Sequence, residues 1–549
     1  MIFPSAKCFH RASFFWSQEF EEAITKSLSI SKDESVDFAA LCPKLSPSLG
    51  LSPKLVESVC HLRSRELERN ANLSWSAAQL DTSIRTYDNV SMEGPLRIQY
   101  ASSFLRKRHP LRYLLEGLPA AHSESESNSS VAVSCLHIQG PSERDILALN
   151  CPNEVVLHGG LKTQVRLEPE SVVSEVFLAR REGQPHVLID LDGHTRSTNH
   201  LPGLLAYSLA PVQIHYLGTP HYPTALPNCQ FYLSSVGLTP PEYYPKSSRG
   251  HVLSERLLIL PHYMVYKPPQ DEVINEMAHT PFTRTEEERR TNARDQERRK
   301  LGIGSDWFVY ACFNQGKKID AIMFSTWIGL LARFQEYFGA DQRAVLWLPQ
   351  VDKTYAQQSL KGEAASKGLS PSHLIFSGKR VSNREEHLAR LAAADVALDS
   401  ARYSAGSVGV EAFLQGIPLV VLASDSSVAS RQATATALTL SDNRNLLSRK
   451  QVFFQPSLLV VASFKEYSDI ALRLASKLRS GNDIISLAHV SSTHLLNQSC
   501  GAAPHKCALK SNDRVRDIER GAAAAFEAKK SNAKGHVFTS RSSSMQFRA

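Results

Sequence analysis

The sequence has 549 residues, of which 42% are hydrophobic and 21% charged, a balance typical of globular proteins rather than of disordered or fibrous chains. Its net charge is +8, without a basic stripe interleaved with aromatic residues, and it has no apolar run of about 18 residues. We therefore predict neither a nucleic-acid partner nor a membrane partner.

Nine cysteines are scattered along the chain without a Cys-x-x-Cys pair. This usage indicates a reducing compartment rather than a disulfide framework or a zinc site, so we predict the cytoplasm, the nucleus or both. The first 18 residues lack acidic side chains and include Lys7 and Arg11. This leaves two alternatives for the segment, an organellar transit segment or a disordered start.

Residues 1–92 are expected to form an N-terminal extension, partly helical and partly disordered. From Leu96 onward, short apolar strands alternate with helical stretches, which predicts parallel βαβ units over 93–282. The predicted strands are 97–100, 131–136, 187–191, 212–217, 231–233 and 257–260. The next stretch, 283–303, is a run of mixed charge that we interpret as an exposed helix or linker between two domains.

A second domain is predicted over 304–480, where the alternation is clearer. The predicted strands are 308–313, 345–348, 374–376, 396–399 and 419–422, separated by helical patterns such as 319–334 and 384–393. This order predicts an α/β fold with a doubly wound parallel sheet. Residues 481–534 are expected to form closing helices, and 535–549 a disordered tail.

Three loops of the second domain carry polar residues beyond the carboxyl ends of predicted strands, where such sheets bind ligands: 314–318, 382–387 and 404–409. The small residues of the third loop would let the backbone approach a phosphate, and the helix that follows offers free N–H groups. Glu411, inside that helix, is placed to accept hydrogen bonds from ribose hydroxyls. Lys318 is placed to neutralise a departing diphosphate.

These blocks together resemble the catalytic region of the O-GlcNAc transferase/SPINDLY family over about residues 95–530. In the second half the resemblance rests on FVYACFNQGKKID, VLWLP, EEHLARLAAADVALD, GVEAFLQGIPLVVL and VASR. In the first half it rests on LRIQYASS, HVLIDLDGHT, LAPVQIHYLGTP and SERLLILP. The resemblance implies a GT-B fold, in which two Rossmann-like doubly wound domains face a cleft, with no metal and no cofactor beyond the donor substrate.

The family's site residues carry over onto matching positions of this sequence. The resemblance implies catalytic roles for Lys318, beside the donor diphosphate, and for His109, on the acceptor side. It implies donor binding by Gln315, Ser382, Arg384, His387, Arg390, Gly406, Ser407, Val408 and Glu411. It also implies possible acceptor-side positions at His194 and Thr219.

Two departures from the family pattern bear on activity. The diphosphate loop, usually Gly-x-Thr-Thr, is Ala405-Gly406-Ser407-Val408 here, so one hydroxyl is lost, at a cost of about 1.5–3 kcal/mol if it bonded to the charged diphosphate. The tetratricopeptide array of typical members is not recognisable. Asp190-Leu191-Asp192 fits the DxD metal motif of another glycosyltransferase fold, but we expect no metal there.

The sequence therefore predicts an inverting, metal-independent protein O-glycosyltransferase. Its partners would be the donor UDP-GlcNAc, the source of N-acetylglucosamine, and acceptor proteins glycosylated on Ser or Thr. Two alternatives remain open: a SPINDLY-like O-fucosyltransferase using GDP-fucose, and a degenerate member that binds a nucleotide or protein without catalysis.

Overall fold

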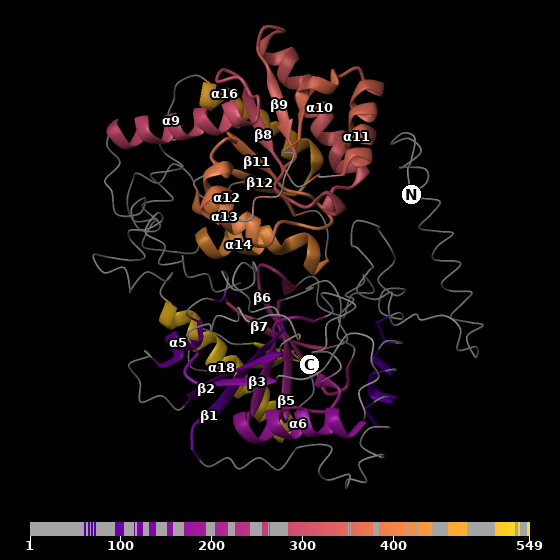
Figure 1. The fold of residues 1–549 in the computed structure, drawn as a ribbon, viewed down its shortest axis with the longest axis vertical. Coiled ribbons are helices and arrows are strands. Elements are labelled where there is room, and N and C mark those ends of the chain that lie inside the picture. The colour runs from indigo at the N-terminus through magenta and orange to yellow at the C-terminus, as the bar shows by residue number, and fades with distance from the viewer. Residues whose placement is uncertain are drawn as a thin grey trace, which may run out of the picture. The chain divides into compact units, whose positions relative to one another are not determined.

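The chain forms two compact units in the computed structural model, one containing residues 270–509 and the other containing 52–269 and 510–549 (Figure 1). The structure describes residues 94–103, 118–123, 131–138, 151–157, 169–193, 204–217, 226–241, 255–261, 284–349, 353–376, 384–415, 417–423, 427–441, 459–479, 511–532, 536–538 and 546–548, with pieces of 60–72 and the single positions 115, 263, 351 and 381. Each unit is an α/β structure built on one sheet.

The unit of 270–509 contains a six-stranded, all-parallel sheet. Its strands are β8 (Phe308–Ala311), β9 (Ala344–Trp347), β10 (Leu374–Ile375), β11 (Val396–Leu398), β12 (Leu419–Leu422) and β13 (Val460–Val461). They lie in the order β10-β9-β8-β11-β12-β13, so the direction of winding reverses between β8 and β11. The predicted doubly wound parallel sheet is confirmed, with β13 as an additional edge strand.

Helices cover both faces of this sheet (Figure 1). They are α9 (Arg284–Lys300), α10 (Ala321–Phe338), α11 (Thr354–Ser366), α12 (Arg384–Leu391), α13 (Ser407–Leu414), α14 (Gln432–Ser441) and α16 (Phe464–Arg479), with short 3-10 turns η5 (Gly316–Lys318), η6 (Pro371–His373) and η7 (Val428–Arg431). Helix α10 begins where the Asp320 carboxylate accepts hydrogen bonds from the backbone N–H groups of Ile322 and Met323, both at 2.9 Å. Its apolar face then buries Trp327 and Phe334 against the sheet.

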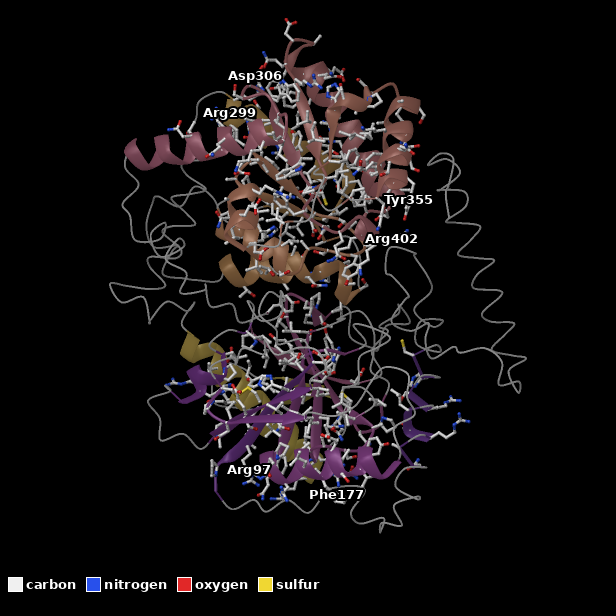
Figure 2. The ribbon with its side chains drawn as sticks, viewed as in Figure 1. Arg97, Phe177, Arg299, Asp306, Tyr355 and Arg402 are labelled. Atoms are coloured by element: carbon white, nitrogen blue, oxygen red, sulfur yellow. A yellow bond between two sulfur atoms is a disulfide. The ribbon has the colours of Figure 1, made fainter. Side chains whose placement is uncertain are left out.

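The mixed-charge run interpreted as an exposed helix or linker forms helix α9. Its last turn is attached to the sheet by Arg298, whose Nη2 lies 2.7 Å from Asp395 Oδ1. Arg298 also donates hydrogen bonds to the carbonyl oxygens of Ala393 and Trp307. Arg298 is 2% exposed, whereas its neighbour Arg299 lies at the surface of the unit (Figure 2). The end of α9 is therefore held by a buried ion pair.

The second unit contains a nine-stranded sheet in the order β15-β14-β7-β6-β5-β4-β1-β2-β3. Its strands are β1 (Leu96–Ser102), β2 (Val131–Ile138), β3 (Glu154–Leu157), β4 (Val187–Asp190), β5 (Val212–His215), β6 (Phe231–Ser235), β7 (Arg256–Leu260), β14 (His536–Phe538) and β15 (Gln546–Arg548). All neighbours pair in parallel except β14 with β15. The parallel βαβ units predicted for 93–282 are confirmed.

The disordered tail predicted for 535–549 is corrected by the structure, because this segment contains β14 and β15. Strand β14 pairs with β7 through Val537 opposite Leu258 and Phe538 opposite Ile259. An edge strand leaves a row of backbone N–H and C=O groups unpaired, and β14 satisfies those of β7. The short apolar pattern around Val537 gave no signal in isolation because its partner strand is remote in sequence.

Helix α18 (Ser511–Lys530) packs in the same unit as β7 and the short helix α5 (Leu118–Ser123). His122 on α5 connects two elements, since its Nδ1 lies 2.8 Å from Glu519 Oε1 and its Nε2 lies 2.9 Å from the Tyr100 hydroxyl. A Cβ at Gly521 would lie 3.2 Å from Leu260 Cδ2, so the absence of a side chain allows α18 to approach β7 closely. Helix α6 (Pro169–Gly183) packs against β2 and β3 of this sheet.

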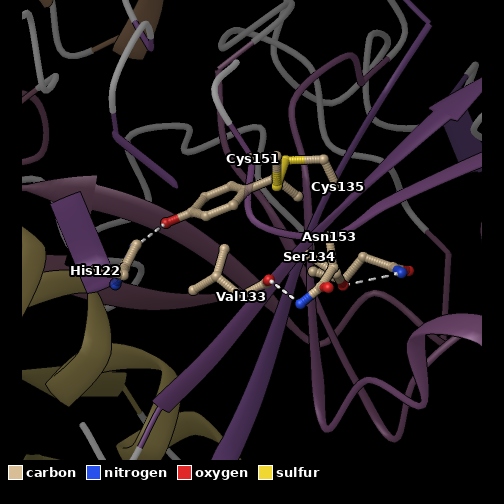
Figure 3. Close-up of a disulfide and its surroundings, with 8 residues drawn as sticks. His122, Val133, Ser134, Cys135, Cys151 and Asn153 are labelled. Atoms are coloured by element: carbon tan, nitrogen blue, oxygen red, sulfur yellow. Dashed lines mark hydrogen bonds between the residues drawn. A yellow bond between two sulfur atoms is a disulfide. The ribbon is translucent and has the colours of Figure 1, made fainter. Parts of the chain in front are cut away.

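A disulfide joins Cys135 on β2 to Cys151, with 6.1 Å between the Cα atoms (Figure 3). The expectation of reduced thiols throughout is therefore wrong, and Cys60 is disulfide-bonded as well. The strand pairing explains the Cys135–Cys151 link, because the Cys135 N–H donates to the Asn153 carbonyl at 2.8 Å and so brings the start of β3 beside β2. The cysteines therefore do not indicate a reducing compartment.

Peptide mapping without reductant is expected to recover Cys135 linked to Cys151. Replacing both by alanine should lower the free energy of unfolding by about 3 kcal/mol, because the link closes a loop of 16 residues in the unfolded chain. The measurement is denaturant unfolding with and without reductant. Reductant should destabilise the unsubstituted protein more than the double variant, and recovery of unlinked peptides would contradict the assignment.

Candidate functional site

The carboxyl ends of β8 and β11 meet at the point where the winding of the sheet reverses. Doubly wound sheets bind ligands at this point, because the connections leave the sheet toward opposite faces and open a crevice. Asn314, just after β8, donates a hydrogen bond from Nδ2 to Asp399 Oδ1, just after β11, at 3.0 Å. The same Nδ2 lies 2.7 Å from the Ser400 hydroxyl. The first predicted ligand loop is thus bonded to the residues that follow β11.

Asp399 connects these loops. Its carboxylate accepts hydrogen bonds from the Ser404 hydroxyl at 2.5 Å and from the Ala405 N–H at 2.7 Å, in addition to Asn314. The side chain is fully buried, and burial raises the pKa of Asp399 although these hydrogen bonds and Lys318 act in the opposite direction. Burying an acceptor of this kind is tolerated only with its donors in place, so Asp399 fixes the shape of the loop that follows it.

Lys318 lies at this junction. Its Nζ donates to the Ser404 carbonyl at 2.9 Å and lies 3.9 Å from the centre of the Tyr403 ring. Burial lowers the pKa of Lys318 to about 8, a shift that Asp399 opposes and Lys317 reinforces. The site therefore holds an ammonium group whose contacts in the described residues are one carbonyl and one aromatic face, both weaker partners than a diphosphate.

The loop from Ala405 leads directly into α13, which begins at Ser407, within the predicted loop 404–409. Gly406 precedes the helix, and no side chain caps it. The first N–H groups of a helix have no partner within the helix, and here they are combined with the positive end of the helix dipole. A Cβ at Gly406 would lie 2.7 Å from Gln432 Oε1, so a larger residue there would require the end of the Gln432 side chain to move. Val408 packs against the hydrophobic core.

His387 and Glu411, both predicted to bind the nucleoside, lie side by side. His387 Nε2 is 2.9 Å from Glu411 Oε2, and their side chains are 22% and 8% exposed. The structure thus brings these two predicted residues together from α12 and α13.

Arg390 lies in a different environment. It is 9% exposed, its guanidinium is 5.7 Å from the centre of the Trp347 ring, and burial lowers its pKa against the charges of Glu386 and Glu297. Gln315, by contrast, is exposed beside η5.

The remaining predicted positions are only partly covered by the structure. Arg384 begins α12, but its side chain is outside the described part. His109, His194, Thr219 and Ser382 lie outside the described residues.

Sequence reasoning did not assign a role to Asp399, Tyr403 or Ser404, and it named Asn314 only as part of a loop. The available signal was position, since Asn314 and Asp399 each stand just beyond the end of a buried strand. Tyr403 and Ser404 had no such signal, because their contacts depend on how the loop returns to the sheet.

The sheet order and its switch point define a doubly wound α/β unit, and the chain contains two sheets with this order. An O-GlcNAc transferase from Thermobaculum terrenum, solved as a point mutant, shares the fold with a TM-score of 0.65 at 18% identity, covering 94% of this chain and 82% of that one. The chain therefore has the two-sheet α/β fold of the GT-B glycosyltransferases; the cleft between the two domains stays a prediction.

Residues 270–490 match the model of the family described as glycosyl transferase family 41. The "Probable UDP-N-acetylglucosamine--peptide N-acetylglucosaminyltransferase SEC" of Arabidopsis thaliana is 24% identical over 390 residues, 69% of this chain and 33% of that protein. The UDP-N-acetylglucosamine–peptide N-acetylglucosaminyltransferase of Caenorhabditis elegans is 28% identical over 179 residues, 33% of this chain and 13% of that protein. This chain is therefore similar to the catalytic region of the O-GlcNAc transferase/SPINDLY family, and it spans about a third of the Arabidopsis relative. Among the described helices, none is both long and apolar enough to cross a membrane.

Proposed function

We propose that the chain is an inverting protein O-glycosyltransferase that transfers N-acetylglucosamine from UDP-GlcNAc to Ser or Thr hydroxyls of proteins, without a metal. The observation that carries the proposal is Lys318 at the switch point between β8 and β11. A cation held there, next to the first turn of α13, is arranged to stabilise the negative charge that develops on the diphosphate as the sugar leaves.

The remaining roles follow from the geometry of the same unit. The N–H groups at the start of α13 and the Ser407 hydroxyl would bind the diphosphate oxygens. The ribose hydroxyls would contact Glu411, adding to or replacing its bond with His387. Asp399 would keep the loop shaped for the donor, because it holds Ser404 and Ala405 in place.

The donor sugar and the capacity for turnover are tested together by incubating the purified full chain with UDP-GlcNAc or with GDP-fucose, and with a library of Ser- and Thr-containing peptides. Sugar transfer and UDP release from UDP-GlcNAc are the expected results. Transfer from GDP-fucose alone would move the assignment to O-fucosylation. Nucleotide binding by calorimetry without turnover of either donor would make the chain a degenerate, binding-only member.

The single hydroxyl left in the diphosphate loop gives a sharper prediction. Ser407→Ala should weaken UDP binding at least about tenfold, because a hydrogen bond to a charged group contributes about 1.5–3 kcal/mol. Calorimetric titration with UDP measures this. Ser359→Ala is the matched control, since Ser359 is a helical serine of the same unit that bonds only to the Tyr355 carbonyl. Equal affinities of the two variants would exclude Ser407 from the diphosphate site.

A further inference from the structure

The N-terminal sheet has a switch point of its own, between β1 and β4. Counted along the chain, its strands follow the same order as those of the other sheet, and the winding reverses where β1 and β4 lie side by side. Ser102 ends β1 and Asp190 ends β4, so both stand at the carboxyl edge where a ligand is expected.

Asp192 is at the centre of this cluster. One carboxylate oxygen accepts a hydrogen bond from the Ser102 hydroxyl, and the other accepts from the Ser103 N–H and the Ser103 hydroxyl, each at 2.6 Å. Asp192 is completely buried and Ser102 is 1% exposed, whereas Ser103 is half-buried. A ligand at the strand edge would therefore reach the carboxylate through the Ser103 hydroxyl.

A buried pair of a carboxylate and an imidazole, Asp190 and His215, lies next to Asp192 and positions its backbone. Asp190 Oδ2 lies 3.0 Å from His215 Nδ1, with both side chains 0% exposed. Asp190 also accepts hydrogen bonds from the N–H groups of Asp192, at 2.9 Å, and Gly193, at 3.1 Å. The backbone that carries Asp192 is thus positioned by the carboxylate two residues before it.

The second ring nitrogen of His215 is the most unusual feature of the cluster. His215 Nε2 is buried and has no hydrogen-bond partner among the described residues. It faces Gly193, where an added Cβ would lie 3.0 Å from Nε2 and 2.3 Å from Cε1. Gly193 has a φ of +49°, a conformation that favours glycine. A buried polar atom without a partner, at the ligand edge of a sheet, indicates a site for an oxygen-bearing ligand.

Burial and the charges of the cluster raise the pKa of Asp192 into the range where it can exchange a proton near neutral pH. Burial and then the charge of Asp190 raise the pKa of Asp192 to about 7, against the hydrogen bonds from Ser102 and Ser103. Burial lowers the pKa of His215, but the hydrogen bond and charge of Asp190 outweigh it, so the net pKa is raised, with Glu255 contributing. Tyr232, whose ring lies 5.3 Å from His215, stays neutral because burial raises its pKa.

We propose that Ser103 and Asp192 form the proton-accepting pair for the acceptor hydroxyl, with Asp190 and His215 positioning Asp192; this rests on the proposed transferase function. As the acceptor oxygen bonds to the anomeric carbon, the bond from that carbon to the diphosphate breaks, and its electron pair leaves with the diphosphate. The acceptor proton passes to Ser103 Oγ, and the Ser103 proton passes to the Asp192 carboxylate.

The test compares Ser103→Ala and Asp192→Asn with Ser134→Ala, another half-buried serine of the same sheet, which bonds to the Gln99 side chain. Sugar transfer to the peptide library and UDP release from UDP-GlcNAc are followed as a function of pH, with UDP affinity measured by calorimetry. Both cluster variants should lose about 100-fold or more of kcat, the range expected for a missing proton acceptor, while UDP affinity stays within about twofold. Ser134→Ala should behave as the unsubstituted protein.

The pH profile separates a chemical role from a structural one. In the unsubstituted protein, kcat should fall as pH decreases below about 7, because Asp192 becomes protonated and cannot accept a proton. That decrease should be missing from the residual activity of Asp192→Asn. If Asp192→Asn binds UDP and keeps either the kcat of the unsubstituted protein or the same decrease of kcat below about pH 7, this inference is wrong and the proposed function stands. If the unsubstituted protein neither binds UDP nor turns over, the proposed function fails, and the inference fails with it.

Discussion

Replacing Lys318 by methionine is expected to reduce donor cleavage by about 100- to 1000-fold, the loss typical of removing one group that stabilises developing charge. Among the described residues, the ammonium group contacts the uncharged Ser404 carbonyl and Tyr403 ring, so its charge is available to the diphosphate. Methionine keeps the apolar stem that fills the half-buried space, so the fold should persist. Release of UDP from UDP-GlcNAc measures the effect.

Lys317→Met is the matched control. Lys317 is the preceding residue, is exposed, and has the same formal charge, so a loss confined to Lys318→Met assigns the effect to position rather than to net charge. If both variants retain full activity, Lys318 is not the diphosphate contact.

The same lysine predicts how UDP binding depends on pH. Because the pKa of Lys318 is about 8, the protein without nucleotide carries the charged form below that pH and loses it above. Bound diphosphate favours the charged form and raises the pKa, so UDP affinity should fall by up to about tenfold per pH unit above about pH 8. Calorimetry across this range should show the decline, and Lys318→Met should remove it.

Arg298→Ala is expected to lower the free energy of unfolding of the 270–509 unit by about 3–5 kcal/mol, the cost of removing one partner of a buried ion pair. The substitution leaves the Asp395 carboxylate, 7% exposed, with its bond from the Val309 N–H and with Arg294 Nη1 at 3.9 Å, but without its buried countercharge at 2.7 Å. It also removes the donors to the Ala393 and Trp307 carbonyls. The end of α9 should then detach from β8 and β11.

Denaturant unfolding followed by tryptophan emission measures this change, since Trp327 and Trp347 are fully buried in the same unit. Arg299→Ala provides the comparison, because Arg299 is exposed and bonds only to the Asp295 carbonyl within its own helix. A difference of less than about 1 kcal/mol between the two variants would show that the ion pair contributes little, as surface pairs do.

The fold was predictable where a pattern is local. Strands such as Val187–Asp190 and Phe231–Ser235 are short apolar runs separated by helical stretches, and this repetition alone indicates parallel sheets. Strand β14 was not predictable, because three residues acquire strand structure only when β7 provides an edge. The Cys135–Cys151 disulfide was not predictable for the same reason. The register of β2 and β3 brings the two cysteines together, and spacing in the sequence does not reveal that register.

The candidate site was predictable as a set of loops but not as a network. The position of Lys318 beyond a strand suggested an anion contact, and the structure brings it to the predicted phosphate loop through Ser404. The central role of Asp399 depends on donors from two segments far apart in the sequence, Asn314 after β8 and Ser404 and Ala405 after β11, and no short sequence window contains both segments. The Ser103–Asp192 cluster was not predicted from the sequence for the same reason, since its residues come from the ends of two strands that are adjacent only in the folded sheet.

The positions of helix α18 and strand β14 in the sequence determine the order in which the two units can complete folding. Both elements complete the unit that contains β1 and β7, yet they follow the whole of the other unit in the sequence. During synthesis, all strands and helices of the 270–509 unit are made before α18 and β14. Until these two elements are made, the edge of β7 is unpaired and the surface that buries Val515 and Ile518 is exposed. Open edges and exposed apolar surface favour aggregation, so the nascent N-terminal half is the part expected to require a chaperone.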